Sequence, residues 1–358
     1  VWVDIMRDKQ LDGLRGVAAI GVVIFHAHYS YLLEWMWTFV DLFFVLSGFL
    51  ITRIVLTGLA NDSFSFKNFM IRRVLRIWPI YYATLAFCML IVLLNFVMVG
   101  EWGHTSGLLS APFFLQFTHH YFESSLNSGS EDFIFWFHHS WSIAVEEQFY
   151  LLMPFLLIAL KGRLTVALLV IVALIPIAVL ARAEGAFHWL LISRMDALCI
   201  GVVLAFYWMN KGRTSGIAFE IGKFWALCLM LVGFLLILID PLSVELSSHL
   251  TKALSLLGFN ILFGVVILVL MEGWFPPLNT LMASSVLVFF GSISYALYLF
   301  HLPVRGALMY ISGQESMAAC SLWVQVSYYG LSIIAAYLSK IFIEDRLNKF
   351  KHRFPVFK

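Results

Sequence analysis

Charged residues are scarce in this sequence. Asp, Glu, Lys and Arg make up 12% of the 358 residues, whereas soluble domains carry about 25%. Hydrophobic residues account for 61% and aromatic residues for 16%. Apolar runs of about 17 to 22 residues recur from residue 16 to residue 341, and each is long enough to cross a bilayer as a helix. The composition excludes a water-soluble domain and predicts an all-α, polytopic protein whose first partner is the lipid bilayer.

Cysteine is scarce too, and other familiar signals are missing. The four cysteines lie inside apolar segments at unrelated spacings, which excludes a disulfide framework and a zinc site. A net charge of +2 without clustered basic and aromatic residues excludes nucleic acid as a partner. No internal repeat and no flexible linker divides the chain. We expect one membrane domain over residues 1–358, with no metal and no permanently bound cofactor.

Ten apolar segments between charged or turn-rich breaks predict ten transmembrane helices. With the N-terminus in the cytoplasm, most Lys and Arg residues between the segments fall on that side, as the positive-inside rule requires for an even number of spans. We therefore expect a cytoplasmic segment at 1–13, an extracytoplasmic connection at 100–140 and a basic cytoplasmic tail at 342–358. The expected helices lie near 16–33, 38–58, 79–99, 141–160, 164–181, 190–209, 224–239, 252–270, 284–304 and 320–341.

The first expected helix carries two ionisable residues, Arg15 and His26. Eleven residues at 100° each make three turns plus about 20°, so both side chains lie on one face, about 16 Å apart along the axis. Ionisable groups inside a bilayer are costly unless they pair or face water. His26 is therefore a candidate catalytic residue near mid-membrane. A snorkelling Arg15 and a hydrogen-bonded interior His26 fit the spacing equally well.

Two further arginines precede the third expected helix. Arg73 and Arg76 are three residues apart and share one helical face. Guanidinium groups bind phosphates through two parallel hydrogen bonds, so the pair is a candidate phosphate-binding fork. The alternative interpretation is a positive-inside anchor at the membrane surface.

Carboxylates lie inside the second and fourth expected helices. Asp41 is near the outer end of the second helix, and Glu146 and Glu147 are adjacent in the fourth. Adjacent helical residues point about 100° apart, and at least one of the two glutamates should face a polar cavity. The other fits a hydrogen-bond network in the outer leaflet. His301, beside the helix-ending Pro303, fits an interfacial cap equally well.

Together these segments resemble the membrane acyltransferase family 3, whose members acylate O-antigen, exopolysaccharide, Nod-factor and macrolide sugars. Five short motifs in the same order carry the resemblance, although each alone is weak. Gly48 in the second motif also fits close helix packing, the commoner role of small residues in membrane helices. The motifs are Leu11–Gly16 followed by His26, Phe43–Ile51 with Ser47 and Gly48, Arg73-x-x-Arg76, Trp141–Tyr150, and Ser294–Pro303 with His301.

The resemblance implies an O-acyltransferase, most often an acetyltransferase, in the bacterial cytoplasmic membrane. Its co-substrate is acyl-CoA, and its acceptor is the hydroxyl of a carbohydrate or glycolipid. His26 is implied as the general base, and either Glu146 or Asp41 orients the imidazole. Substrate-binding residues implied by the motifs are Arg15, Arg73, Arg76, Ser47, Glu147, Tyr150 and His301.

Two other classes of protein could carry such buried ionisable residues. A secondary transporter or a flippase of lipid-linked sugars would use buried His and Glu to relay protons and arginines to gate substrate. Such proteins favour internal repeats and matching broken helices, and the sequence shows neither. A purely structural membrane subunit would not retain so many intramembrane ionisable groups. The acceptor's identity, the acyl chain length, a covalent acyl-enzyme and the oligomeric state are left open.

Overall fold

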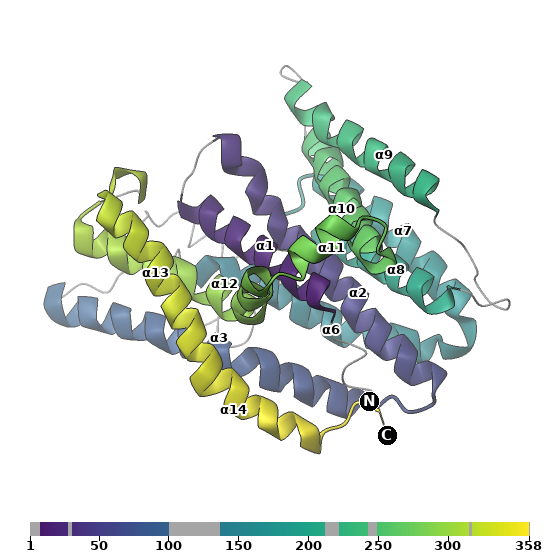
Figure 1. Cartoon of the computed structure of the whole chain (residues 1–358), viewed down its shortest axis with the longest axis horizontal. Helices are drawn as coiled ribbons and strands as arrows, with labels where there is room; N and C mark the ends of the chain where they lie inside the picture. The colour runs from purple at the N-terminus through teal and green to yellow at the C-terminus, as the bar shows by residue number, and fades with distance from the viewer. Residues whose placement is uncertain are drawn as a thin grey trace.

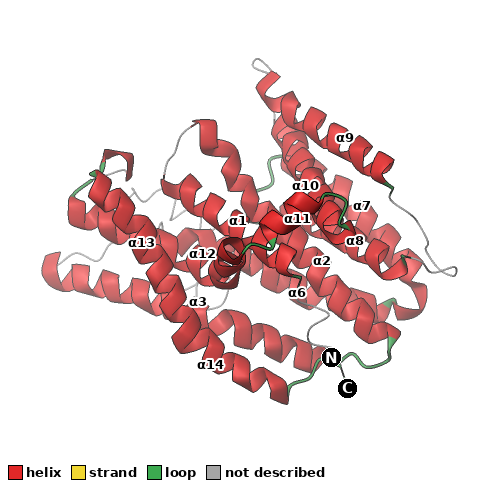
Figure 2. Ribbon diagram, viewed as in Figure 1, coloured by secondary structure: helices red, strands yellow, loops and turns green. Residues whose placement is uncertain are grey.

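A computed structural model describes residues 8–27, 31–99, 137–211, 222–242, 249–314 and 317–357. Within these ranges the chain is helical, and its one β-type contact is an isolated bridge (Figure 2). The α-helices are α1 (Lys9–Ala27), α2 (Phe39–Ala60), α3 (Phe66–Val99), α6 (Trp141–Ala159), α7 (Leu164–Ala183), α8 (Met195–Asn210), α9 (Lys223–Leu242), α10 (His249–Glu272), α11 (Pro276–Met282), α12 (Ser285–Ser312), α13 (Leu322–Ser339) and α14 (Asp345–Asn348).

The helices confirm the all-α, polytopic fold. In the described part of the chain, nine helical segments are long and apolar enough to cross a membrane. The helix α1 is not among the nine, and it begins at Lys9, earlier than the expected start at residue 16. Residues 1–7 and 100–136, which hold much of the expected N-terminal segment and nearly all of the extracytoplasmic connection, lie outside the described residues.

Helix α1 lies in the middle of the bundle, in backbone contact with α12 (Figure 1). A Cβ atom at Gly16 would collide with the carbonyl oxygen of Leu287, and one at Gly291 would collide with that of Asp12. Glycine at both positions lets the two helices approach closely, as small residues do in membranes. The contact holds the helix of the first motif against the helix of the last motif.

A second close contact joins α2 and α8. A Cβ atom at Gly48 would collide with the carbonyl oxygen of Leu198, and one at Gly201 with that of Val45. Gly48 therefore serves the helix packing that its residue type suggests. The adjacent Ser47 is thereby held at a fixed depth in the bundle.

The inner and outer helices differ in how much of their surface is covered. In the segment Leu33–Ala60, which contains α2, 78% of the most apolar stretch is buried within the protein, whereas in Lys223–Asp240 of α9 only 11% is buried. Large exposed side chains such as Phe224 and Leu235 lie on α9, and Trp323 lies on α13. Because these helices sit at the edge of the bundle (Figure 1), their apolar faces are the surfaces that meet lipid.

The chain continues in helical form beyond α13. A π-helical turn, η9 (Lys340–Glu344), leads into α14 and then into a 3-10 turn, η10 (Lys349–Arg353). We call residues 340–357 the C-terminal arm. It runs beside the first half of α3 (Figure 1), and the backbone N–H of Ser65 donates to the carbonyl of Val356 at 2.9 Å. The segment expected as a basic tail is an ordered helical element of the bundle.

Candidate active site

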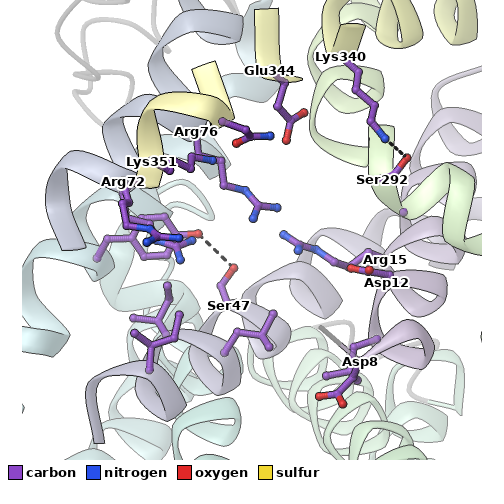
Figure 3. Close-up of a pocket in the computed structure, with 18 of the residues that line it drawn as sticks. Asp8, Asp12, Arg15, Ser47, Arg72, Arg76, Ser292, Lys340, Glu344 and Lys351 are labelled. Carbon is purple, nitrogen blue, oxygen red and sulfur yellow. Dashed lines mark hydrogen bonds between the residues drawn. The ribbon is translucent and has the colours of Figure 1, made fainter. Parts of the chain in front are cut away.

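A cavity of about 430 Å³ lies where α1, α2 and α3 meet the C-terminal arm (Figure 3). More cationic than anionic side chains line it. Of its acidic residues, Asp8 is already paired with Arg53 at 2.8 Å, so the cavity carries an excess of positive charge. The cations are Arg15, Arg72, Arg73, Arg76, Lys340 and Lys351, and the acids are Asp8, Asp12, Glu344 and Asp345.

Three arginines from the sequence prediction, Arg15, Arg73 and Arg76, come together in this cavity. None of them takes part in the salt bridges among the described residues. The Nε atoms of Arg15 and Arg73 are buried without a hydrogen-bond partner in the same part of the chain. The guanidinium of Arg73 lies 5.4 Å from the Phe69 ring and 5.6 Å from the Tyr150 ring. Guanidinium groups that gather without a salt bridge to a described carboxylate form a site for an anion such as phosphate.

Glu146 accepts hydrogen bonds from two hydroxyl groups in the wall of the cavity. The Ser47 hydroxyl donates to one carboxylate oxygen at 2.6 Å, and the Tyr150 hydroxyl donates to the other at 2.7 Å. Ser47 and Tyr150 themselves line the cavity. Glu146 also attracts Arg15 and Arg73 electrostatically. The carboxylate therefore fixes the wall against which the arginines lie.

His26 and His301 form a pair on the facing sides of α1 and α12. Nδ1 of His26 lies 3.2 Å from Nε2 of His301 and 2.9 Å from the carbonyl oxygen of Val22. Nδ1 of His301 lies 2.6 Å from the carbonyl oxygen of Tyr298. A carbonyl only accepts, so each Nδ1 carries the hydrogen, and Nε2 of His301 accepts from His26. Nε2 of His26 is left with its lone pair free of partners among the described residues, as a general base requires.

A third histidine, His139, extends this pair and was missed by the sequence analysis. It belongs to the 3-10 turn η5 (His138–Ser140) and is only 2% exposed. Its ring lies 5.1 Å from that of His301 and 5.1 Å from that of Tyr298. The His138-His139 dipeptide before an expected helix was the available signal, but periodicity places such residues at the interface. No three metal-ligating side chains of the described residues form a group suited to a metal ion.

The structure places Asp41 in a different cluster. Both of its oxygens lie 3.0 Å from Nη1 of Arg194, and its side chain is fully buried. The guanidinium of Arg194 lies 5.3 Å from the rings of Trp37 and Trp141. Burial and the charge of Arg194 lower the pKa of nearby His188, in the loop before η7 (Leu191–Arg194), to about 3. Asp41 thus neutralises a buried arginine and does not touch His26.

The ten site residues expected from the sequence fall into four sets. Glu147 lies beside Trp78, outside the cavity lining, and Asp41 pairs with Arg194. Neither these carboxylates nor Glu146 contacts His26 among the residues described. The cavity brings together Arg15, Arg73, Arg76, Ser47 and Tyr150, with Glu146 bonded to the last two, and His26 pairs with His301.

The family comparison identifies the class of protein to which the chain belongs. Residues 8–341 match the acyltransferase 3 family model, which describes an acyltransferase domain. The chain is 29% identical, over 94% of its length, to YrhL of Bacillus subtilis, provisionally named a peptidoglycan O-acetyltransferase. It is 25% identical, over 95% of its length, to the O-acetyltransferase OatA of Staphylococcus aureus.

The chain spans 54% and 57% of these two relatives. A provisionally named O-acetyltransferase of Staphylococcus aureus strain COL is 27% identical over 95% of the chain, which covers 57% of that protein. No solved structure matches the chain. Since the family model covers nearly all of its residues, the chain belongs to the acyltransferase 3 family of integral membrane proteins.

Proposed function

We propose that the protein is a membrane O-acetyltransferase that moves an acetyl group from acetyl-CoA to a hydroxyl of a carbohydrate or glycolipid. The observation that carries the proposal is the cationic cavity, in which Arg15, Arg73 and Arg76 form no salt bridge with any described carboxylate. A donor with several phosphate groups supplies the anions that these guanidinium groups need. The O-acetyltransferase names of the relatives support the same reaction class.

The donor would enter through the cavity with its phosphates at the arginines. Arg15 and His26 are both carried by α1, and eleven residues separate them by about 16 Å along the helix axis. Coenzyme A carries its thioester at the far end of a long arm, so phosphates held at Arg15 leave the thioester free to reach towards His26. The charge pattern favours a cytoplasmic opening for the cavity, which is where acyl-CoA is made.

The chemistry then needs one base and one leaving group. Nε2 of His26 takes the proton of the acceptor hydroxyl, whose oxygen attacks the thioester carbonyl carbon. The tetrahedral intermediate collapses by breaking the C–S bond, and the imidazolium passes its proton to the departing thiolate. The products are the acetyl ester and free CoA. Nε2 of His301 accepts the Nδ1–H of His26 at 3.2 Å, which holds the required tautomer and orientation of the ring, as the carboxylate does in a triad.

Glu146 has a different role in this proposal from the one that the sequence favoured. It accepts hydrogen bonds from the hydroxyls of Ser47 and Tyr150, and its charge attracts Arg15 and Arg73. We assign it the positioning of the donor cavity, and we assign the orientation of His26 to His301. The proposed acceptor class is supported by the relatives, one of which is provisionally named for peptidoglycan.

Incubation of the purified protein with acetyl-labelled CoA tests this function. We expect release of CoA and transfer of label to an added glycan. Arg73→Ala and Arg76→Ala should weaken CoA binding about tenfold each, because each removes charge-assisted hydrogen bonds. Arg73→Lys should restore binding only in part, since lysine lacks the planar fork. Lys223→Ala, at an exposed site on α9, is the control that should bind CoA as the parent does.

Two results would count against the proposal. Unchanged CoA binding in both alanine variants would make the arginines topology anchors. A protein that neither binds nor consumes acetyl-CoA, yet moves a lipid-linked sugar between leaflets, would support the transporter hypothesis.

A further inference from the structure

The C-terminal arm contributes side chains to the cationic cavity, although most of the arm lies beyond the family match. The match ends at residue 341, and Glu344, Asn348 and Lys351 line the cavity together with Arg15. Figure 3 shows Lys351 beside Arg76 and Arg72, with Glu344 on the same side of the cavity. The donor cavity is therefore completed by an element that the family motifs do not include.

Lys351 is placed where a cation is costly. It is half-buried, and it is repelled by Arg72, Arg73 and Arg76, with Glu344 as the opposing charge. No salt bridge among the described residues involves Lys351. A lysine held in this position opposes stability unless an anion binds there, because like charges at short range repel strongly where water is excluded.

The arm is fastened so that Lys351 cannot simply swing away. Beyond it, the Asn68 side chain donates to the carbonyl of Pro355 at 2.7 Å, and Phe64 forms a backbone bridge with Phe357. Before it, the π-helical turn η9 adds a residue to the helical ladder, a feature frequent at functional sites. At its first residue, Lys340 donates to Ser292 on α12 at 2.8 Å. Both sides of the arm are thus attached to the bundle, with Lys351 between the attachments.

We propose that Lys351 binds a phosphate group of the acyl-CoA donor, so that the C-terminal arm forms one wall of the donor site. This inference rests on the proposed function. The ammonium group supplies a compact charge with three donors, which suits a phosphate that the planar arginine forks leave partly uncovered. The ligand class is a phosphorylated nucleotide that carries a thioester at the end of a long chain. Lys351 would bind the nucleotide end of that ligand.

The test compares Lys351→Ala with Lys349→Ala by equilibrium binding of CoA to the full-length protein. Lys349 is exposed, two residues away, and outside the cavity lining, so its loss removes the same charge without the contact. We expect Lys351→Ala to weaken CoA binding about tenfold and Lys349→Ala by less than about twofold. Lys351→Arg should recover most of the loss. Without CoA, Lys349→Ala and Lys351→Arg should unfold near the parental temperature, and Lys351→Ala should unfold no lower than the parent, because it removes a repelled cation.

Two shorter donors show which part of the molecule Lys351 recognises. Acetyl-pantetheine has no phosphate, and its slower turnover should be equal in the parent and in Lys351→Ala. Dephospho-CoA lacks the 3′-phosphate, and a loss of affinity confined to intact CoA would assign the contact to that group. A loss shared by CoA and dephospho-CoA would assign it to the diphosphate. Either result supports the proposal.

The failure of this inference is separable from the failure of the proposed function. If the parent binds CoA and Lys351→Ala binds it equally well, the arm is structural and the inference is overturned alone. An equal loss in Lys349→Ala would overturn it as well, since the effect would then be general screening of charge. If the parent binds no CoA, both the function and the inference fall.

Discussion

At the scale of single residues, the reactivity of His26 depends on the hydrogen bonds of its other ring nitrogen. Its Nδ1 faces the carbonyl of Val22 and Nε2 of His301. Both are satisfied by a hydrogen on Nδ1, so the free lone pair is confined to Nε2. A neighbouring carboxylate is not needed for this arrangement, which explains why none of the three candidate carboxylates contacts the ring.

We expect His26→Ala to lower turnover by about 10²-fold to 10⁴-fold, the usual contribution of a general base. CoA binding should be unchanged, because His26 does not line the arginine cavity. His249→Ala, at an exposed site on α10, is the matched control and should keep parental turnover. Steady-state kinetics with acetyl-CoA measures both. Turnover of His26→Ala within a few-fold of the parent would remove the residue from the reaction.

Asp41 leads to a prediction about stability. Asp41→Asn leaves the guanidinium of Arg194 buried and uncompensated, which costs about 3–5 kcal/mol. We expect the midpoint of thermal unfolding in detergent to drop sharply. Glu147→Gln, which breaks no salt bridge among the described residues, should unfold near the parental temperature. If Asp41→Asn unfolded like the parent but lost turnover, the catalytic role that the sequence suggested for Asp41 would be restored.

At the scale of helices, the sequence predicts which segments form helices better than it predicts which helices contact each other. Nine of the ten predicted apolar segments coincide with membrane-length helices of the described residues, and the first forms α1, because the need to satisfy backbone groups in lipid leaves helix as the one option for each run. The partner of Asp41, by contrast, lies 153 residues away in the chain. Periodicity states which way a side chain points and not which helix it meets, so Arg194 could not be chosen from the sequence.

The ends of helices were also difficult to predict from the sequence. The charges at Lys9, Asp12 and Arg15 argued for a start at residue 16, yet α1 begins at Lys9. Asp12 and Arg15 line the cavity and do not face lipid, and the backbone of Asp12 packs against Gly291 of α12. In the same way, the basic composition of 342–358 predicted a tail. No residue pattern in this segment indicates the π-helical turn or the anchoring contacts at its end.

The contact between α1 and α12 carries a prediction of its own. In Gly291→Ala the new methyl group meets the backbone of Asp12, which cannot rotate away. The helices must separate, at a cost of about 1–3 kcal/mol typical of overpacking, and the His26–His301 pair should open with them. Turnover and the unfolding temperature should fall together.

Gly330→Ala on α13 is the control for this substitution. Its Cβ atom would meet nothing within 4 Å, so it should be neutral or stabilise by up to about 1 kcal/mol through helix propensity. Equal behaviour of the two variants would show that close approach of α1 and α12 is not required.

At the scale of the whole molecule, the polar groups of the site lie inside the bundle, one after the other along the axis of α1. The cationic cavity lies at one end of α1, and His26 lies about 16 Å further along the same helix. Lipid-facing helices such as α9 surround this polar axis. A donor and an acceptor could therefore reach the same imidazole from opposite sides of the membrane, without either crossing it completely.

This arrangement requires that the cavity and the C-terminal arm face the cytoplasm, and cysteine labelling can measure that. Lys349→Cys places an exposed thiol on the arm, and Glu184→Cys places one in the exposed loop after α7. The parent supplies the background, since Cys88, Cys199 and Cys320 are buried and only Cys228 is partly exposed. A membrane-impermeant maleimide is added to intact cells and then to permeabilised cells.

We expect Glu184→Cys to react in intact cells and Lys349→Cys to react only after permeabilisation. The reason is the charge distribution: the basic loops and the arm collect on one side, and translocating them is the costly alternative. Labelling of Lys349→Cys in intact cells would place the cationic cavity outside, where acyl-CoA is absent. The arginines and Lys351 would then have to bind a different phosphorylated ligand, and His26 would draw its acyl group from a donor other than CoA.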